Sequence, residues 1–413
     1  MKARSRTTGG AVLRRARYWL PVSAMTLLSI VSYVDRNVLA LLAPTILRDT
    51  GLSAEEYGFM ISSFSAAYLV GNPVWGMTLD RFGLPAGLAI SVTLWTCSSV
   101  CHALVTTAVG FAAARALLGF GEGATFPGGL RAAVQTLRPS HRSRGIAIAY
   151  SGGSIGAIAA PLLVTPVAVR WGWRGAFIAT GVLGVGWLAL WAMTARDVRL
   201  RRRPQRSAGV RPRLHEASIL RFVAAYAFGG LPLGFVLYGA PIHLGRELGF
   251  DQSRLGHVLW IPPLGWEVGY LFWAWVVDRA SRRATPRRFG FLFGILAVLA
   301  VPLAAAGVSR SGPLVLALMF LAMFASAGFV IVSLAEVTRG RAGHGAYLAG
   351  IGAGAWSALM AIVMPAFGRL FDRGAFGLAY SIAAFSPAAG YAIWRLLRYL
   401  DSPPSARTAS TYR

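Results

Sequence analysis

Apolar stretches long enough to cross a lipid bilayer follow one another along almost the whole chain. About 20 mostly apolar residues in a helix cross the ~30 Å hydrocarbon core. Twelve such windows are centred near residues 32, 69, 96, 122, 157, 183, 233, 266, 298, 324, 356 and 387. With 55% hydrophobic and 14% charged residues, the chain is too apolar for a soluble globular protein, in which charged residues reach about 25%. The sequence predicts an all-α polytopic membrane protein with twelve transmembrane helices.

The longest polar interruption, rich in arginine, divides these windows into six and six. The predicted segments are a cytoplasmic N-terminus (1–17), a six-helix bundle (18–194), a basic cytoplasmic linker (195–221), a second six-helix bundle (222–399) and a cytoplasmic tail (400–413). Most of the 41 Lys and Arg residues fall on the side of the membrane that holds both ends of the chain. The positive-inside rule therefore places both termini in the cytoplasm.

The charge and the cysteines exclude several functional classes. A net charge of +26 would indicate nucleic-acid binding only if the arginines formed a patch on a folded soluble domain. Here the arginines lie between apolar spans. The linker arginines could contact anionic lipid headgroups, although the positive-inside rule alone accounts for them. Cys97 and Cys101 lie one helical turn apart and are expected to be buried, reduced thiols rather than a disulfide. The loops are short and hold no catalytic or metal-ligating cluster, so we expect neither an enzyme nor a cofactor.

A short motif recurs at the same place in each half. The second window is followed by Gly76-Met-Thr-Leu-Asp80-Arg81-Phe-Gly83, and the eighth by Ala274-Trp-Val-Val-Asp278-Arg279. Such a glycine lets two helices approach closely, and the Asp and Arg can cap helix ends and bridge the two halves on the cytoplasmic side. We therefore predict a role in conformational gating for Gly76, Asp80, Arg81, Gly83, Asp278 and Arg279. The alternative is a plain turn with exposed charges.

Four ionisable residues lie within the first and fourth windows. Asp35 and Arg36 stand in the middle of an otherwise uncharged run, where a charge costs at least about 2.5–3.5 kcal/mol. Arg115 and Glu122 are two helical turns apart and share a helix face. Asp35 and Glu122 both fall near the membrane midplane and could meet across one cavity. A purely structural role, in which Arg and Asp neutralise each other and join two helices, is the alternative.

Aromatic and amide side chains accompany these charges at helical spacing. Tyr33, Arg36 and Asn37 share one face of the first helix, and Tyr68 and Asn72 share one face of the second. The planar guanidinium of arginine matches the two oxygens of a carboxylate. The sequence therefore predicts a polar, aromatic and cationic cavity for an anion.

Two parallel six-span repeats with this loop motif resemble the major facilitator superfamily. Within it the chain resembles the anion:cation symporter group, through Tyr33-x-Asp35-Arg36, Tyr68, Arg115-Ala-Leu-Leu-Gly-Phe-Gly-Glu122-Gly-Ala-Thr-Phe-Pro127 and Gly172-Trp173-Arg174-x-x-Phe177. Ser65-Ala-Ala-Tyr68, Pro73, Ser154-Ile-Gly-Ala157 and Ala160-Pro161 are most similar to the hexuronate transporter subgroup. The resemblance implies a bacterial inner-membrane protein. It also implies substrate binding by Tyr33, Arg36, Tyr68 and Arg115, and proton coupling by Asp35 and Glu122.

The expected function is import of an organic carboxylate by proton symport with alternating access, by a protein acting as a monomer. The carboxylate would be a sugar acid such as a hexuronate, or another small organic anion. An exporter or anion exchanger of the same fold, for a drug or an aromatic or aliphatic carboxylate, is the alternative. The second half contains no asparagine to bind sugar hydroxyls, so a less hydroxylated anion fits equally well. Glu267 is either a further proton site or a partner of His243 or His257.

Overall fold

The computed structural model describes residues 5–201, 216–281, 286–339 and 345–401, and the regular structure in these ranges is helical, without a β-strand. The chain forms two compact units, Met1–Leu52 with Ser63–Arg206 and Ser53–Ser62 with Ser207–Arg413. Residues 202–215 of the predicted linker and 402–413 of the predicted tail lie outside the described residues.

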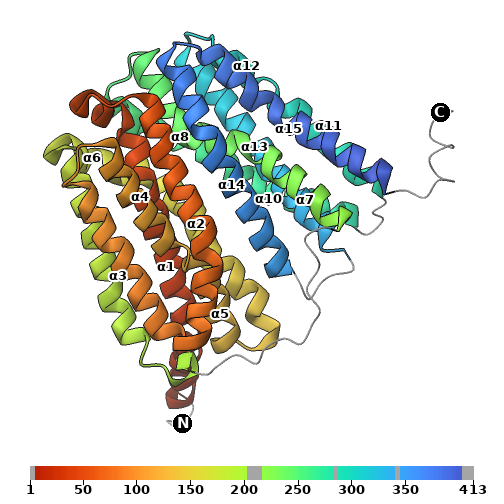
Figure 1. The fold of residues 1–413 in the computed structure, drawn as a ribbon. Coiled ribbons are helices and arrows are strands. Elements are labelled where there is room, and N and C mark those ends of the chain that lie inside the picture. Colours follow the sequence, from red (N-terminus) through yellow and green to blue (C-terminus); the bar gives the residue numbers. More distant parts are fainter. Residues whose placement is uncertain (1–4, 202–215, 282–285, 340–344, 402–413) are drawn as a thin grey trace. The chain divides into compact units, whose positions relative to one another are not determined.

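The first unit contains α1 (Ser5–Thr50), α3 (Leu84–His102), α4 (Ala108–Glu122), α5 (Thr125–Thr136), α6 (Pro139–Thr194) and the short helix η1 (Val198–Arg201). The second contains α7 (Ala217–Gly229), α8 (Leu231–Arg246), α9 (Gln252–Val258), α10 (Ile261–Ser281), α11 (Pro286–Ala300), α12 (Leu303–Ala306), α13 (Gly312–Val337), α14 (Gly345–Asp372) and α15 (Phe376–Leu400). The helix α2 (Ala54–Phe82) begins in the second unit and continues in the first. Figure 1 labels most of these helices along the chain.

The twelve predicted spans are all present as helices. Within the described residues, eight helical segments are long and apolar enough to cross a membrane. One of them, α6, holds two spans, because its backbone bends at Gly172, where φ is +72°. The other three spans are α2, the consecutive pair α4 and α5, and α10, and each predicted window centre falls in its own span. The predicted twelve-helix membrane fold is confirmed.

Small residues bring the helices of the first unit close together. A Cβ atom at Gly152 or Gly156 of α6 would lie 2.2 Å from the Thr26 oxygen or 2.6 Å from the Ile30 oxygen of α1. On α4, a Cβ at Gly119 would lie 2.3 Å from a backbone oxygen of α2. Backbones that approach this closely hold α1, α2, α4 and α6 in fixed register, which fixes where their polar side chains meet.

The first turn of α2 belongs to the second unit, where its backbone N–H groups are capped. Ser53 and Glu56 form a capping box, in which the Ser53 hydroxyl accepts from the Glu56 N–H at 3.1 Å and the Glu56 carboxylate accepts from the Ser53 N–H at 2.8 Å. The Asp372 carboxylate, at the end of α14, accepts from the N–H groups of Ala54 at 2.9 Å and Glu55 at 2.8 Å. These bonds satisfy backbone donors that have no partner inside the helix.

The outward faces of the spans are apolar, as expected for contact with lipid. Leu271 of α10, Val298 of α11 and Ile362 of α14 are 64%, 70% and 74% exposed. Cys97 and Cys101 are free but lie exposed on α3, so the expectation that both are buried is wrong. The apolar stretch around them indicated a membrane span, and such a span has a lipid-facing side as well as a core side.

Candidate functional site

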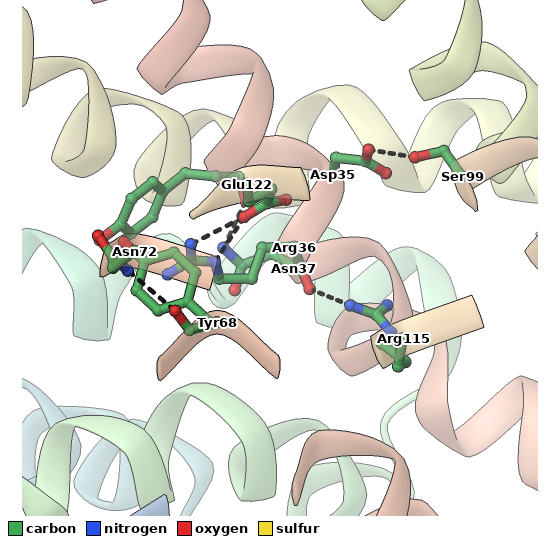
Figure 2. A network of polar contacts seen from close by, with 9 residues as sticks. Asp35, Arg36, Asn37, Tyr68, Asn72, Ser99, Arg115 and Glu122 are labelled. Carbon is green, nitrogen blue, oxygen red and sulfur yellow. Dashed lines mark hydrogen bonds and ion pairs between the residues drawn. The ribbon is translucent and has the colours of Figure 1, made fainter. Parts of the chain in front are cut away.

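A buried ion pair joins α1 to α4 in the first unit. The Arg36 guanidinium donates to the Glu122 Oε2 atom from Nη2 at 2.8 Å and from Nε at 3.1 Å (Figure 2). The Glu122 side chain is 0% exposed and the Arg36 side chain 9% exposed. Two charge-assisted bonds to one oxygen make this the strongest polar contact at the site.

Three aromatic rings surround the same guanidinium. The Arg36 Cζ atom lies 4.6 Å from the ring centroid of Tyr33, 4.8 Å from that of Phe64 and 4.8 Å from that of Tyr68. The predicted shared face of Tyr33 and Arg36 is therefore present, and Tyr68 of α2 faces it. Sequence reasoning missed Phe64, although its position four residues before Tyr68 places both rings on one face of α2.

Asp35 points away from this pair, although it is the neighbour of Arg36 in the sequence. Its carboxylate accepts a hydrogen bond from the Ser99 hydroxyl of α3 (Figure 2). It accepts a second from the Thr180 hydroxyl of α6 at 3.0 Å. Consecutive residues on a helix do not face each other. In the described part of the chain Asp35 forms no ion pair, so it neither neutralises an arginine nor meets Glu122 as the sequence suggested.

Arg115 connects α4 to the backbone of α1. Its Nη1 atom donates to the Arg36 carbonyl at 3.1 Å, and the residue is 1% exposed. It therefore lies beside the ion pair, on the face of α4 that it was predicted to share with Glu122. The amides of Asn37 and Asn72 each donate to the carbonyl four residues earlier in their own helix, at 2.7 Å and 3.0 Å. Their direct role in substrate binding stays a prediction.

The loop motif of the first half makes an ion pair within its own unit. Asp80 accepts from the Arg131 guanidinium of α5 at 2.5 Å, a partner that sequence reasoning did not assign. Gly83 adopts φ +84° at the start of α3, a conformation that favours glycine. Within the described residues a Cβ at Gly76 would meet nothing within 4 Å, so its predicted role in close helix packing stays a prediction. Arg81 lies over the neighbouring Phe82 ring, and the gating role of the motif stays a prediction.

The second unit contributes weaker candidates. Asp278 is exposed, and Arg279 lies 5.4 Å from an aromatic ring of its own helix. Glu267 is half-buried on α10. The His243 ring packs against two aromatic rings of α15, and His257 contacts a carbonyl of its own helix α9. Among the described residues neither histidine pairs with Glu267. No group of three or more His, Cys, Asp or Glu side chains in those residues could hold a metal ion.

Comparison with known proteins places this arrangement in a family. A model described as Major Facilitator Superfamily matches residues 25–343. The chain is 35% identical over 173 residues to the hexuronate transporter of Escherichia coli K12, an alignment that covers 42% of this chain and 40% of that protein. It is 27% identical to the galacturonate transporter of Dickeya chrysanthemi, covering 61% and 79%, and 26% identical to the hexuronate transporter of Bacillus subtilis, covering 68% and 69%.

Solved structures agree on the fold. A bacterial homologue of the human lysosomal transporter Spinster superposes with a TM-score of 0.71 at 17% identity, covering 92% of this chain and 95% of that one. The predicted resemblance to this superfamily and to its hexuronate transporter subgroup is confirmed. The chain belongs to the Major Facilitator Superfamily, and it is a multi-pass membrane transport protein rather than an enzyme.

Proposed function

We propose that this transporter imports a small organic carboxylate together with protons, by alternating access, in a bacterial inner membrane with both termini in the cytoplasm. We propose further that it acts as a monomer. The observation that carries the proposal is the environment of Arg36. Its guanidinium lies among three aromatic rings, and its counter-ion is a buried carboxylate of the protein itself.

A substrate carboxylate can replace that internal counter-ion. Glu122 uses one oxygen for both hydrogen bonds from Arg36, whereas a free carboxylate can offer two oxygens to the planar fork. The aromatic rings stabilise the cation during the exchange, because their faces attract positive charge. Arg115 donates a hydrogen bond to the Arg36 carbonyl and is the second cation of the site.

Protons enter the mechanism through competition for Arg36. While Glu122 is ionised, it holds the guanidinium, and an incoming anion would add a second negative charge to a buried site. A proton on Glu122 removes its charge and leaves Arg36 for the substrate. Proton and anion then bind cooperatively, and this mutual dependence is what couples their movement.

The relatives support a sugar acid as the substrate, because several of them are named as hexuronate or galacturonate transporters. The second half of the chain contains no asparagine, so a less hydroxylated anion is the alternative substrate. The buried hydroxyls of the second unit include those of Ser326 and Ser333, two helical turns apart on α13, and neither has a hydrogen-bond partner among the described residues.

Uptake into proteoliposomes tests the proposal. The panel contains glucuronate, galacturonate, a sugar aldonate and an aromatic carboxylate, each with and without an imposed proton gradient. We expect uphill uptake of at least one carboxylate, lost when the gradient is collapsed and lost in Arg36→Gln. Arg310→Gln is the matched control, because that arginine is 81% exposed. Exchange without uphill uptake would favour the anion exchanger, and transport of neutral sugars or lipophilic cations alone would refute anion recognition.

A further inference from the structure

The carboxylate of Asp35 has surroundings of its own. Asp35 is 1% exposed, and the two hydroxyls that contact it come from different helices, Ser99 from α3 and Thr180 from α6. Ser99 donates to Oδ2 and Thr180 to Oδ1, so each carboxylate oxygen has one donor. A buried charge needs compensation by a partner or by hydrogen bonds; here the hydroxyls supply it.

The charged and titratable groups nearby are engaged elsewhere. On α1 the Arg36 guanidinium bonds to Glu122, and on α4 Arg115 bonds to the Arg36 carbonyl. On α3 the His102 ring contacts a carbonyl of its own helix and stacks on an aromatic ring of α6. Glu122 and Arg115 act on the Asp35 carboxylate through space from α4. Its direct hydrogen-bond partners are the two hydroxyls, Ser99 from α3 and Thr180 from α6.

The Thr180 hydroxyl has two acceptors for one proton. Its Oγ1 atom lies 3.0 Å from Asp35 Oδ1 and 3.0 Å from the Phe177 carbonyl of its own helix. When Asp35 is ionised, Thr180 donates to the carboxylate. When Asp35 carries a proton on Oδ1, that proton can be donated to Oγ1 while Thr180 donates to Phe177 instead. Every polar atom of this group keeps a partner in both states, which is what a reversible proton site requires.

The resemblance to the anion:cation symporter group already implies proton coupling by Asp35; we infer that Ser99 and Thr180 are the positioning residues that hold its carboxylate and set the pH at which it takes up a proton. The coupling role of this proton site rests on the proposed function. The site itself does not, because its geometry involves no substrate. Since the hydroxyls belong to α3 and α6 while Asp35 belongs to α1, protonation also changes the bonds that tie α1 to its neighbours.

Infrared difference spectra of the full chain in liposomes, recorded across pH without substrate, test the inference. The Asp35 carboxyl band is identified by its loss in Asp35→Asn. In Ser99→Ala and in Thr180→Val the ionised form loses one donor, so we expect the midpoint of that band to rise by about one pH unit. Thr180→Ser should restore the wild-type midpoint. Ser91→Ala is the control, because that fully buried α3 hydroxyl donates to its own helix and should leave the midpoint unchanged.

Two results would overturn the inference. One is a wild-type midpoint in both Ser99→Ala and Thr180→Val. The other is the absence of any titrating band that disappears in Asp35→Asn. If Ser99→Ala or Thr180→Val does not fold, the frequency of the Asp35 carboxyl band is recorded instead in Ser99→Thr and Thr180→Ser, which keep a hydroxyl donor. If the midpoint shifts but the protein imports no carboxylate, the proposed function is refuted and this inference is retained. If the protein imports a carboxylate but the midpoints do not shift, this inference is refuted and the proposed function is retained.

Discussion

Replacing Glu122 by glutamine separates anion binding from proton coupling. The amide keeps the shape of the side chain and one oxygen acceptor for Arg36, but it carries no charge and binds no proton. Hydrogen bonds between charged groups are worth about 1.5–3 kcal/mol and neutral ones about 0.5–1.5 kcal/mol. The interaction between the side chain at position 122 and the Arg36 guanidinium therefore weakens by about 1–2 kcal/mol. This predicts about 5- to 30-fold tighter carboxylate binding at alkaline pH.

In the proposed mechanism the same substitution removes one coupled proton from each transport cycle. A charge moved through 100 mV is worth about 2.3 kcal/mol, and 1.4 kcal/mol corresponds to about a tenfold ratio. In Glu122→Gln the steady-state accumulation driven by a proton-motive force of 100 mV should therefore fall about 40-fold. Exchange of internal for external carboxylate should continue, because it needs no net proton movement.

Proteoliposomes allow both quantities to be measured on one preparation. Radiolabelled carboxylate accumulation is followed under an imposed proton-motive force, and exchange is followed without one. Glu247→Gln serves as the matched control, since that carboxylate lies outside the site and its nearest cation is 4.0 Å away. Undiminished uphill accumulation in Glu122→Gln would refute the reasoning, and so would loss of exchange and accumulation together in a folded protein.

Three further substitutions, with Gly76→Ala as the control for one of them, test other parts of the structure. Arg36→Lys keeps the charge but loses the planar fork and the ring stacking, so the KM for carboxylate uptake should rise about tenfold, as expected for one lost charge-assisted bond. Gly119→Val places a Cβ 2.3 Å from the Phe64 oxygen and should lower the melting temperature in detergent strongly, while Gly76→Ala, in open space, should not. Asp372→Ala removes the acceptor for the first N–H groups of α2 and should cost about 1 kcal/mol in thermal unfolding; an unchanged melting temperature would contradict that capping role.

The span pattern and the helix faces could be predicted because both depend on local sequence. Apolar length marks a span whatever it packs against, and i, i+3 and i, i+4 spacing placed Tyr33 beside Arg36 correctly. The same rule identifies Phe64 once Tyr68 is known. It also separates Asp35 from Arg36, because adjacent residues on a helix diverge.

The partners of the buried charges could not be predicted, because they come from distant parts of the chain. Ser99 and Thr180 are ordinary small polar residues in apolar spans, and only the packing of α3 and α6 against α1 brings them to Asp35. Arg131 likewise gave no signal as the partner of Asp80. Helix crossing positions depend on side-chain shape along whole interfaces, which a single sequence does not reveal.

The charges of the site account for why two separate acids are useful. Asp35 and Glu122 balance Arg36 and Arg115 when all four are ionised, so a bound monocarboxylate leaves one uncompensated negative charge in a buried site. One proton restores neutrality, and the resulting complex crosses the membrane without working with or against the membrane potential. A second proton on the other acid gives the complex one positive charge, so the inward-negative potential adds about 2.3 kcal/mol per 100 mV to import. The two acids have different direct partners, since Glu122 pairs with Arg36, the proposed substrate ligand, while Asp35 is hydrogen-bonded to two hydroxyls. Import of a monocarboxylate by this site therefore moves positive charge inward only if both carboxylates are protonated in the loaded state, and either Asp35→Asn or Glu122→Gln alone should change the charge moved in each cycle.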